Sequence, residues 1–136
     1  MMTERQKQAA AVVGAVNTPM KAYSIIRSHH ENMNTGLISV IICDKERKVI
    51  DITQRVGDLT EDWHSTLADA VECKGHDGIV IAYNKDGKRY TDDAHVKAIG
   101  DLHDALNDCG ISLYDVLVCG EGKFFSFADE RLYKTE

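Results

Sequence analysis

A short loop rich in basic and aromatic residues contains the side chains best suited to binding or chemistry. It follows the apolar run Ile79–Tyr83, which is typical of a buried strand, and precedes an acidic helix start. Ligands of α/β proteins collect at the carboxyl ends of strands, and lysine or arginine there could hold an anion such as phosphate. An ordinary solvated loop is the competing interpretation. The candidate binding residues are Tyr83, Asn84, Lys85, Lys88, Arg89, Tyr90 and Thr91.

A second candidate surface is acidic. Asp101, Asp104 and Asp108 recur at three- and four-residue spacing on the outer face of the helix predicted from Thr91 to Cys109. Such charges are usually a solvated helix face. On a small protein they can also engage a basic surface of a partner, and this alternative stays open.

Six histidines suggest a metal site, but their spacing argues against one. His95 and His103 are eight residues apart on one predicted helix, too far to bind a single metal ion. A zinc site rebuilt from His95 and Asp92 would lack the third protein ligand that catalytic zinc usually has. We therefore predict no metal ligands, no cofactor and no catalytic residues.

Composition indicates one ordinary globular domain, residues 1–136, with 43% hydrophobic and 28% charged residues. The net charge of −6 argues against general nucleic-acid binding and against binding to anionic membranes. No apolar run is long enough for a membrane span, and the first residues do not resemble a signal peptide. The four cysteines form no CxxC pair, so we expect reduced thiols and a cytoplasmic protein.

Hydrophobic periodicity predicts the order ααββαβαββ. This order implies an α/β fold, with a mixed sheet of about five strands flanked by helices on both faces. Thr60 is expected to cap the third helix. The predicted helices are 3–16, Pro19 to about Glu31–Asn34, Thr60 to Gly75, and Thr91 to Cys109. The predicted strands are Leu37–Cys43, Lys48–Gln54, Ile79–Tyr83, Ser112–Cys119 and Lys123–Phe127.

From about Val16 onward, the chain resembles the RadC-like branch of the JAB/MPN (JAMM) domain superfamily. The family pattern GI-x-x-x-DH, an apolar strand, Gly, an aromatic residue and SF-x-E matches Gly110-Ile111, Asp115, the strand to Gly120, and Gly122–Glu130. Val116 stands where the family has His. The hairpin Leu37–Ile50, with Asp44 and Arg47 at its turn, and Thr18-Pro19 with Ala22-Tyr23 are also similar to the family. The resemblance implies a JAB/MPN-like fold with cytidine-deaminase-like layering.

The resemblance also implies where a metal would bind. JAMM domains bind zinc through H-x-H and the Asp of S-x-x-D, and an upstream Glu acts as general base. Here H-x-H falls on Tyr83-Asn84-Lys85, S-x-x-D falls on Thr91–Ala94, and the Glu position falls near Gly36. A lysine repels zinc, and a tyrosine, with an ordinary pKa of about 10, is a poor ligand at neutral pH. The metal-binding motif is therefore degenerate.

These observations predict a non-catalytic RadC/JAB-like domain that binds a protein or another macromolecule. Small RadC-like proteins resemble accessory genes of mobile elements, so a phage or plasmid setting is expected. The partner is predicted to be a protein of unidentified kind, and self-association is open. The alternative is a JAMM-type metal-dependent hydrolase, or a DNA-repair-associated RadC-like protein, with a displaced metal site.

Overall fold

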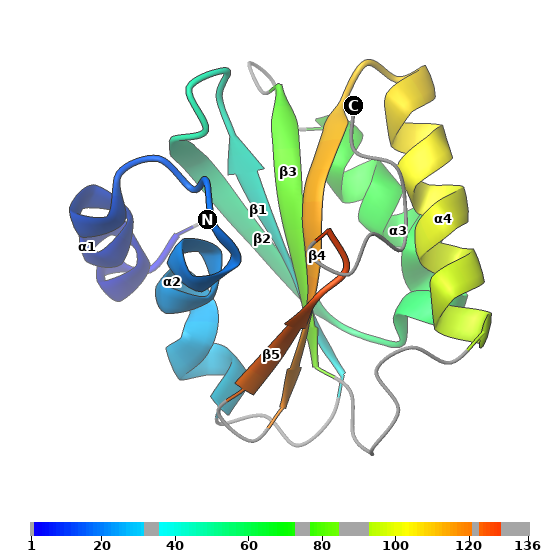
Figure 1. Ribbon diagram of the computed structural model, residues 1–136, viewed down its shortest axis with the longest axis horizontal. Coiled ribbons are helices and arrows are strands. Elements are labelled where there is room, and N and C mark those ends of the chain that lie inside the picture. Colours follow the sequence, from blue (N-terminus) through cyan, green and yellow to red (C-terminus); the bar gives the residue numbers. More distant parts are fainter. Residues whose placement is uncertain (1, 32–35, 73–76, 85–92, 121–122, 129–136) are drawn as a thin grey trace.

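A five-stranded mixed sheet runs through the centre of the protein (Figure 1). The computed structural model describes residues 2–31, 36–72, 77–84, 93–120 and 123–128. The strand order is β2-β1-β3-β4-β5, and every neighbouring pair is antiparallel except β3 and β4, which are parallel. The strands are β1 Leu37–Cys43, β2 Val49–Val56, β3 Gly78–Asn84, β4 Ser112–Gly120 and β5 Lys123–Ser126.

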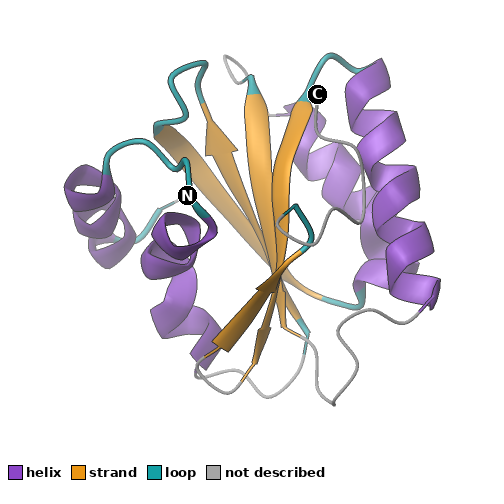
Figure 2. Ribbon diagram, viewed as in Figure 1, coloured by secondary structure: helices purple, strands orange, loops and turns teal. Residues whose placement is uncertain are grey.

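Helices cover both faces of this sheet (Figure 2). α1 (Glu4–Val13) and α2 (Pro19–Glu31) lie on one side, while α3 (Leu59–Glu72) and α4 (Asp93–Asp108) lie on the other. The predicted α/β class, the element order and the mixed sheet are therefore confirmed. Among the described residues, no helix has the length and apolar character needed to span a membrane.

The sheet separates two hydrophobic clusters, and β1 contributes to both. Ile38, Val40 and Ile42 pack on the side of α3 and α4, while Ile41 and Cys43 pack on the side of α2. Every residue of β1 is buried. A strand covered on both faces is apolar at nearly every position, which explains why this run is continuous rather than alternating.

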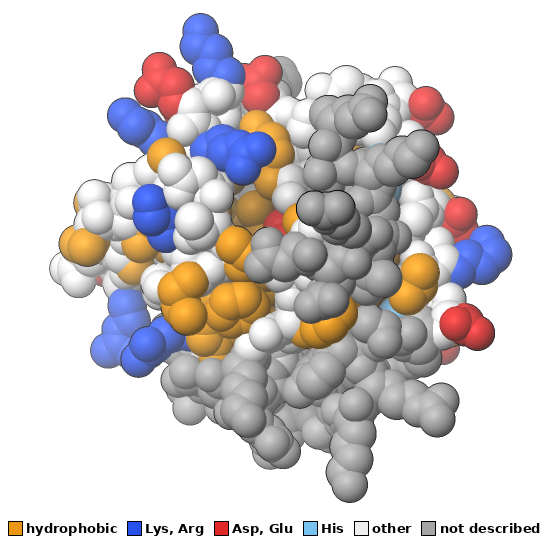
Figure 3. Space-filling model, in the orientation of Figure 1, with side chains coloured by type: hydrophobic (Ala, Val, Ile, Leu, Met, Phe, Trp, Pro, Cys, Tyr) orange, Lys and Arg blue, Asp and Glu red, His pale blue; other side chains and the backbone are white. Residues whose placement is uncertain are grey.

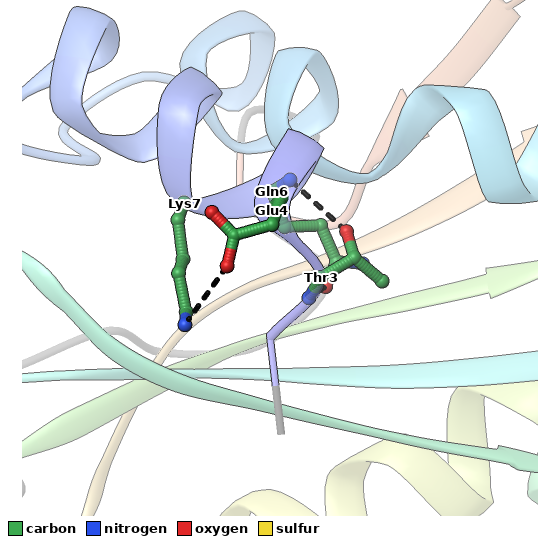
Figure 4. A network of polar contacts seen from close by, with 4 residues as sticks. All are labelled: Thr3, Glu4, Gln6 and Lys7. Carbon is green, nitrogen blue, oxygen red and sulfur yellow. Dashed lines mark hydrogen bonds and ion pairs between the residues drawn. The ribbon is translucent and has the colours of Figure 1, made fainter.

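A capping box starts α1 (Figure 4). The backbone N–H of Gln6 donates to the Thr3 hydroxyl at 3.1 Å, and the Gln6 side chain accepts from the Thr3 N–H at 3.0 Å. The helix ends at Val13, so the prediction that it reaches residue 16 is wrong. Gly14 adopts φ +72°, a conformation that glycine tolerates, and the following residues bond to the β1–β2 turn through Val16 N–H and Arg47 C=O at 2.8 Å.

Candidate functional site

Two ring side chains meet at the carboxyl end of β3. Tyr83 is the last residue but one of the strand, and His95 lies in the first turn of α4. The Tyr83 hydroxyl oxygen lies 3.2 Å from Nε2 of His95, and the ring centroids lie 5.6 Å apart. Only 3% of Tyr83 and 8% of His95 is exposed. The strand end and the helix start are thus joined by a buried polar contact.

Asp58 completes this cluster from the β2–α3 junction. Its Oδ1 lies 3.9 Å from Nε2 of His95. The same oxygen accepts hydrogen bonds from the N–H of Thr60 at 2.8 Å and from its hydroxyl at 2.5 Å. Asp58 therefore caps α3, which begins at Leu59, and the prediction that Thr60 is the cap is wrong.

Strand pairing brings these three segments together. β1 pairs with β2 and with β3, so Leu37 lies opposite Val56 while Ile38 lies opposite Tyr83. The carboxyl ends of β2 and β3 therefore lie side by side across β1, at the same end of the sheet. The chain leaves β2 through Gly57, whose N–H donates to the carbonyl of Gly36 at 3.0 Å, and Asp58 follows directly.

Electrostatics fix the charge of Asp58. Burial alone would raise its pKa, but hydrogen bonds from the Thr60 hydroxyl and N–H, the nearby His95 and the Tyr83 hydroxyl together lower it below the ordinary value of 3.8. Asp58 is therefore a carboxylate at neutral pH. The Tyr83 hydroxyl contributes to this lowering and also lies within hydrogen-bond distance of Nε2 of His95, so it links the histidine to the carboxylate.

The predicted binding loop is described only at its first two positions. Tyr83 and Asn84 both belong to β3, and 4% of Asn84 is exposed. Both side chains are therefore buried in the interior, and we assign them to the strand that holds the start of the loop. Lys85, Lys88, Arg89, Tyr90 and Thr91 lie outside the described residues, and their binding role stays a prediction.

The predicted acidic face lies along the outside of α4. Asp101 forms an ion pair with Lys97 at 3.0 Å, and Asp104 lies 3.3 Å from Nδ1 of His103. Asp108 is exposed at the last turn. Figure 3 shows Asp and Glu side chains along the edge of the molecule where α4 runs. This face lies away from the Tyr83–His95 contact, so the two predicted sites are separate.

The mixed five-stranded sheet flanked by helices agrees with the fold that the family resemblance implies, and a direct comparison decides the assignment. The family model for the RadC-like JAB domain matches residues 16–132. The chain belongs to the RadC-like JAB domain family. A comparison with curated proteins found no match.

The resemblance to RadC-like JAB domains places the first zinc ligand at Tyr83. The residues around Tyr83 therefore show whether this site could hold zinc. Catalytic zinc usually takes three protein ligands, whereas this cluster offers one imidazole, one carboxylate and a tyrosine hydroxyl, which is a poor zinc ligand at neutral pH. In the described segments, no three His, Cys, Asp or Glu side chains form a group that could hold a metal ion. The cluster does not fit zinc.

The position of the general base is also closed to a side chain. The resemblance places it near Gly36, and a Cβ built on Gly36 would overlap the carbonyl oxygen of Gly57. That carbonyl belongs to the turn that delivers Asp58. A glutamate at residue 36 would therefore require this RadC-like JAB domain to move the β2–α3 junction.

Sequence reasoning found Tyr83 and His95 separately and missed Asp58. A local signal existed, because Asp58 is followed three residues later by Glu61, a pattern typical of a capped helix start. That signal predicts the cap. It says nothing of the contact with Tyr83, which depends on strand pairing.

Proposed function

We propose that this RadC-like JAB domain is a metal-independent module that binds another protein. The observation that carries the proposal is the buried Tyr83–His95 contact, because a tyrosine and its histidine partner occupy the strand end where the family resemblance expects a metal. Asp58 accepts from the Tyr83 hydroxyl and supports the same arrangement. Tyr83 and His95 are buried and contact each other, so the cluster stabilises the β3–α4 junction.

The surface that we assign to the partner is the outer side of α3 and α4. Four acidic residues lie in α3 and four in α4, and Lys97 is the one Lys or Arg in these two helices, although Asp69 is paired with Arg55 of β2 at 2.8 Å. A field of one sign attracts a surface of the other sign and steers encounter. The partner is therefore a protein with a basic face, and the predicted phage or plasmid setting stays a prediction.

Metal content tests the first half of the proposal. Untagged protein, purified without chelators, is analysed for zinc alongside the His95→Ala variant, with folding of both checked by circular dichroism. We expect neither protein to contain stoichiometric zinc. One zinc per chain that is lost in His95→Ala would contradict the proposal and support the alternative of a hydrolase with a displaced metal site.

Charge-matched variants test the second half. Asp101→Asn with Asp108→Asn removes two charges from the proposed face, while Glu4→Gln with Glu46→Gln removes two exposed charges elsewhere. Asp104 is left unchanged because it contacts the buried His103. A partner captured by the unaltered protein should be lost with the first pair and kept with the second. Equal capture by the two double variants would show that the charges of Asp101 and Asp108 do not contribute to binding.

A further inference from the structure

A cavity of about 420 Å³ lies at the other end of the β3–β4 pair, at the amino ends of these strands. The first turn of α2, the β1–β2 turn, the start of β4 and the inner side of α4 surround it. Tyr83 and His95 lie at the carboxyl end of β3, so the cavity is separate from that cluster. Its volume is in the range of small-molecule sites.

Arg47 is held in place at the rim of this cavity. Its backbone adopts φ +63°, and it is fixed on both sides, by a bond from its N–H to the Asp44 carbonyl at 2.9 Å and a bond from Val16 N–H to its carbonyl at 2.8 Å. The guanidinium lies 4.1 Å from the centroid of the Tyr114 ring. Stacking of this kind orients the cation without using its hydrogen-bond donors.

Several polar groups around the cavity are uncommitted within the described part of the chain. There, the guanidinium of Arg47 forms no hydrogen bond or ion pair, and the same holds for the side chains of Asn17 and Ser112. Burial raises the pKa of Tyr114, so its hydroxyl remains a donor at neutral pH. Hydrogen-bond donors that line a cavity beside a cation suit an anionic group.

The rest of the lining is mixed, because Thr18, His103 and Asn107 add polar groups to an otherwise hydrophobic wall that also holds one carboxylate. Pro19, Ala22, Val80 and Leu113 supply hydrophobic surface. Asp115 also lines the cavity, but it already accepts three hydrogen bonds, from Val116 N–H, Ala128 N–H and the Ser126 hydroxyl. In Figure 3 the surface is hollowed beside Lys and Arg side chains, with hydrophobic side chains and part of an acidic side chain at the bottom of the hollow.

We propose that this cavity binds a small organic anion, whose carboxylate or phosphate pairs with Arg47 and whose compact apolar body lies against Pro19, Ala22 and Leu113. The planar guanidinium presents two parallel N–H groups that match two oxygens of either anion. The apolar wall selects ligands that carry a hydrophobic group next to the charge.

Nuclear magnetic resonance of the full-length, ¹⁵N-labelled protein tests the proposal with four probes: benzoate, phenyl phosphate, benzyl alcohol and benzylamine. We expect either or both anions to shift the amide signals of residues 16–18, 20–22, 47 and 112–115, and the two other probes to leave them unchanged. The relative affinity of benzoate and phenyl phosphate distinguishes a carboxylate ligand from a phosphate ligand.

Variants of the turn supply the controls. Arg47→Gln should weaken binding of the preferred anion by about tenfold or more. Arg47→Lys keeps the charge but loses the two parallel N–H groups of the guanidinium, so it should give an intermediate loss of affinity. Lys48→Gln removes a neighbouring charge that pairs with Glu46 and does not line the cavity, so binding should not change. Unfolding curves confirm that each variant is folded.

Three results would overturn the proposal. The first is no signal change with either anion at about 10 mM, ten times a millimolar dissociation constant. The second is an equal response to benzylamine, which would mean that charge is not recognised. The third is unchanged affinity in both Arg47 variants. None of these results depends on whether α4 binds a partner.

Discussion

The hydroxyl of Ser126 donates a 2.6 Å hydrogen bond to Oδ2 of Asp115, and this contact fastens the end of β5 to β4. Oδ1 of Asp115 accepts from the backbone N–H of Val116 at 2.7 Å and of Ala128 at 3.0 Å. Only 6% of Asp115 is exposed. The Asp and Ser of the family pattern are therefore structural partners in this chain, and Val116, in place of the family's His, is buried in the core.

Loss of this contact should lower stability. Asp115→Ala leaves three donors without an acceptor, and we expect the free energy of unfolding to fall by about 2–3 kcal/mol. Ser126→Ala removes one charge-assisted bond and should cost about 1–2 kcal/mol. Urea denaturation gives both values. Ser24→Ala, which removes a hydroxyl from the exposed side of α2, is the control and should change stability by less than about 0.5 kcal/mol.

The folded pKa of Asp58, below 3.8, predicts a dependence of stability on pH. A group whose pKa is lowered by folding stabilises the folded state while both states are ionised. Its contribution is lost as the pH falls through 3.8, the value in the unfolded chain, toward the lower folded value. The free energy of unfolding, measured by urea denaturation between about pH 6 and about pH 3, should therefore fall toward acid.

Asp58→Asn is the matched control for that prediction. Asparagine still caps a helix, so α3 keeps its start while the titrating charge is removed. The variant should lose less stability between neutral and acid pH than the unaltered protein does. Parallel pH profiles for the two proteins would show that Asp58 does not couple folding to protons.

The sequence predicts the fold better than it predicts the site, and particular residues show why. The run Leu37–Cys43 is apolar at nearly every position because helices cover both faces of β1, so burial can be inferred from the residue types alone. The contact of Tyr83 with His95 and Asp58 is different. It joins a strand end, a helix start and a helix cap that only the pairing of β1 with β2 and β3 brings together.

The Tyr83 hydroxyl should contribute to stability. Tyr83→Phe keeps the ring against His95 but removes the hydroxyl that contacts Nε2 of His95 and helps to lower the pKa of Asp58. Buried polar atoms then lose a partner, so we expect a fall of about 1–2 kcal/mol in the free energy of unfolding, measured in urea. Tyr23→Phe, a change of the same type on the α2 side of the sheet, is a comparison for the loss of a tyrosine hydroxyl outside this cluster. An unchanged stability in Tyr83→Phe would remove the cluster as a support of the β3–α4 junction.

Two glycines should respond in opposite directions to the same added methyl group. At Gly78, the first residue of β3, a Cβ would overlap the ring of Tyr114, so Gly78→Ala should lower the free energy of unfolding by about 1–3 kcal/mol. At Gly100, inside α4, a Cβ meets nothing within 4 Å, and alanine favours the helix. Gly100→Ala should therefore raise stability by about 0.5–1 kcal/mol.

A double-mutant cycle separates the overlap at Gly78 from other effects on β3. If the Tyr114 ring is the obstacle, Gly78→Ala should cost much less in a Tyr114→Ala background than in the unaltered protein, and urea denaturation of the four proteins gives the coupling. An equal loss in the free energy of unfolding in both backgrounds would mean that alanine destabilises β3 independently of the Tyr114 ring. The ring of Tyr114 is also the surface on which Arg47 stacks, so close packing of Tyr114 on Gly78 helps to hold that cation in place.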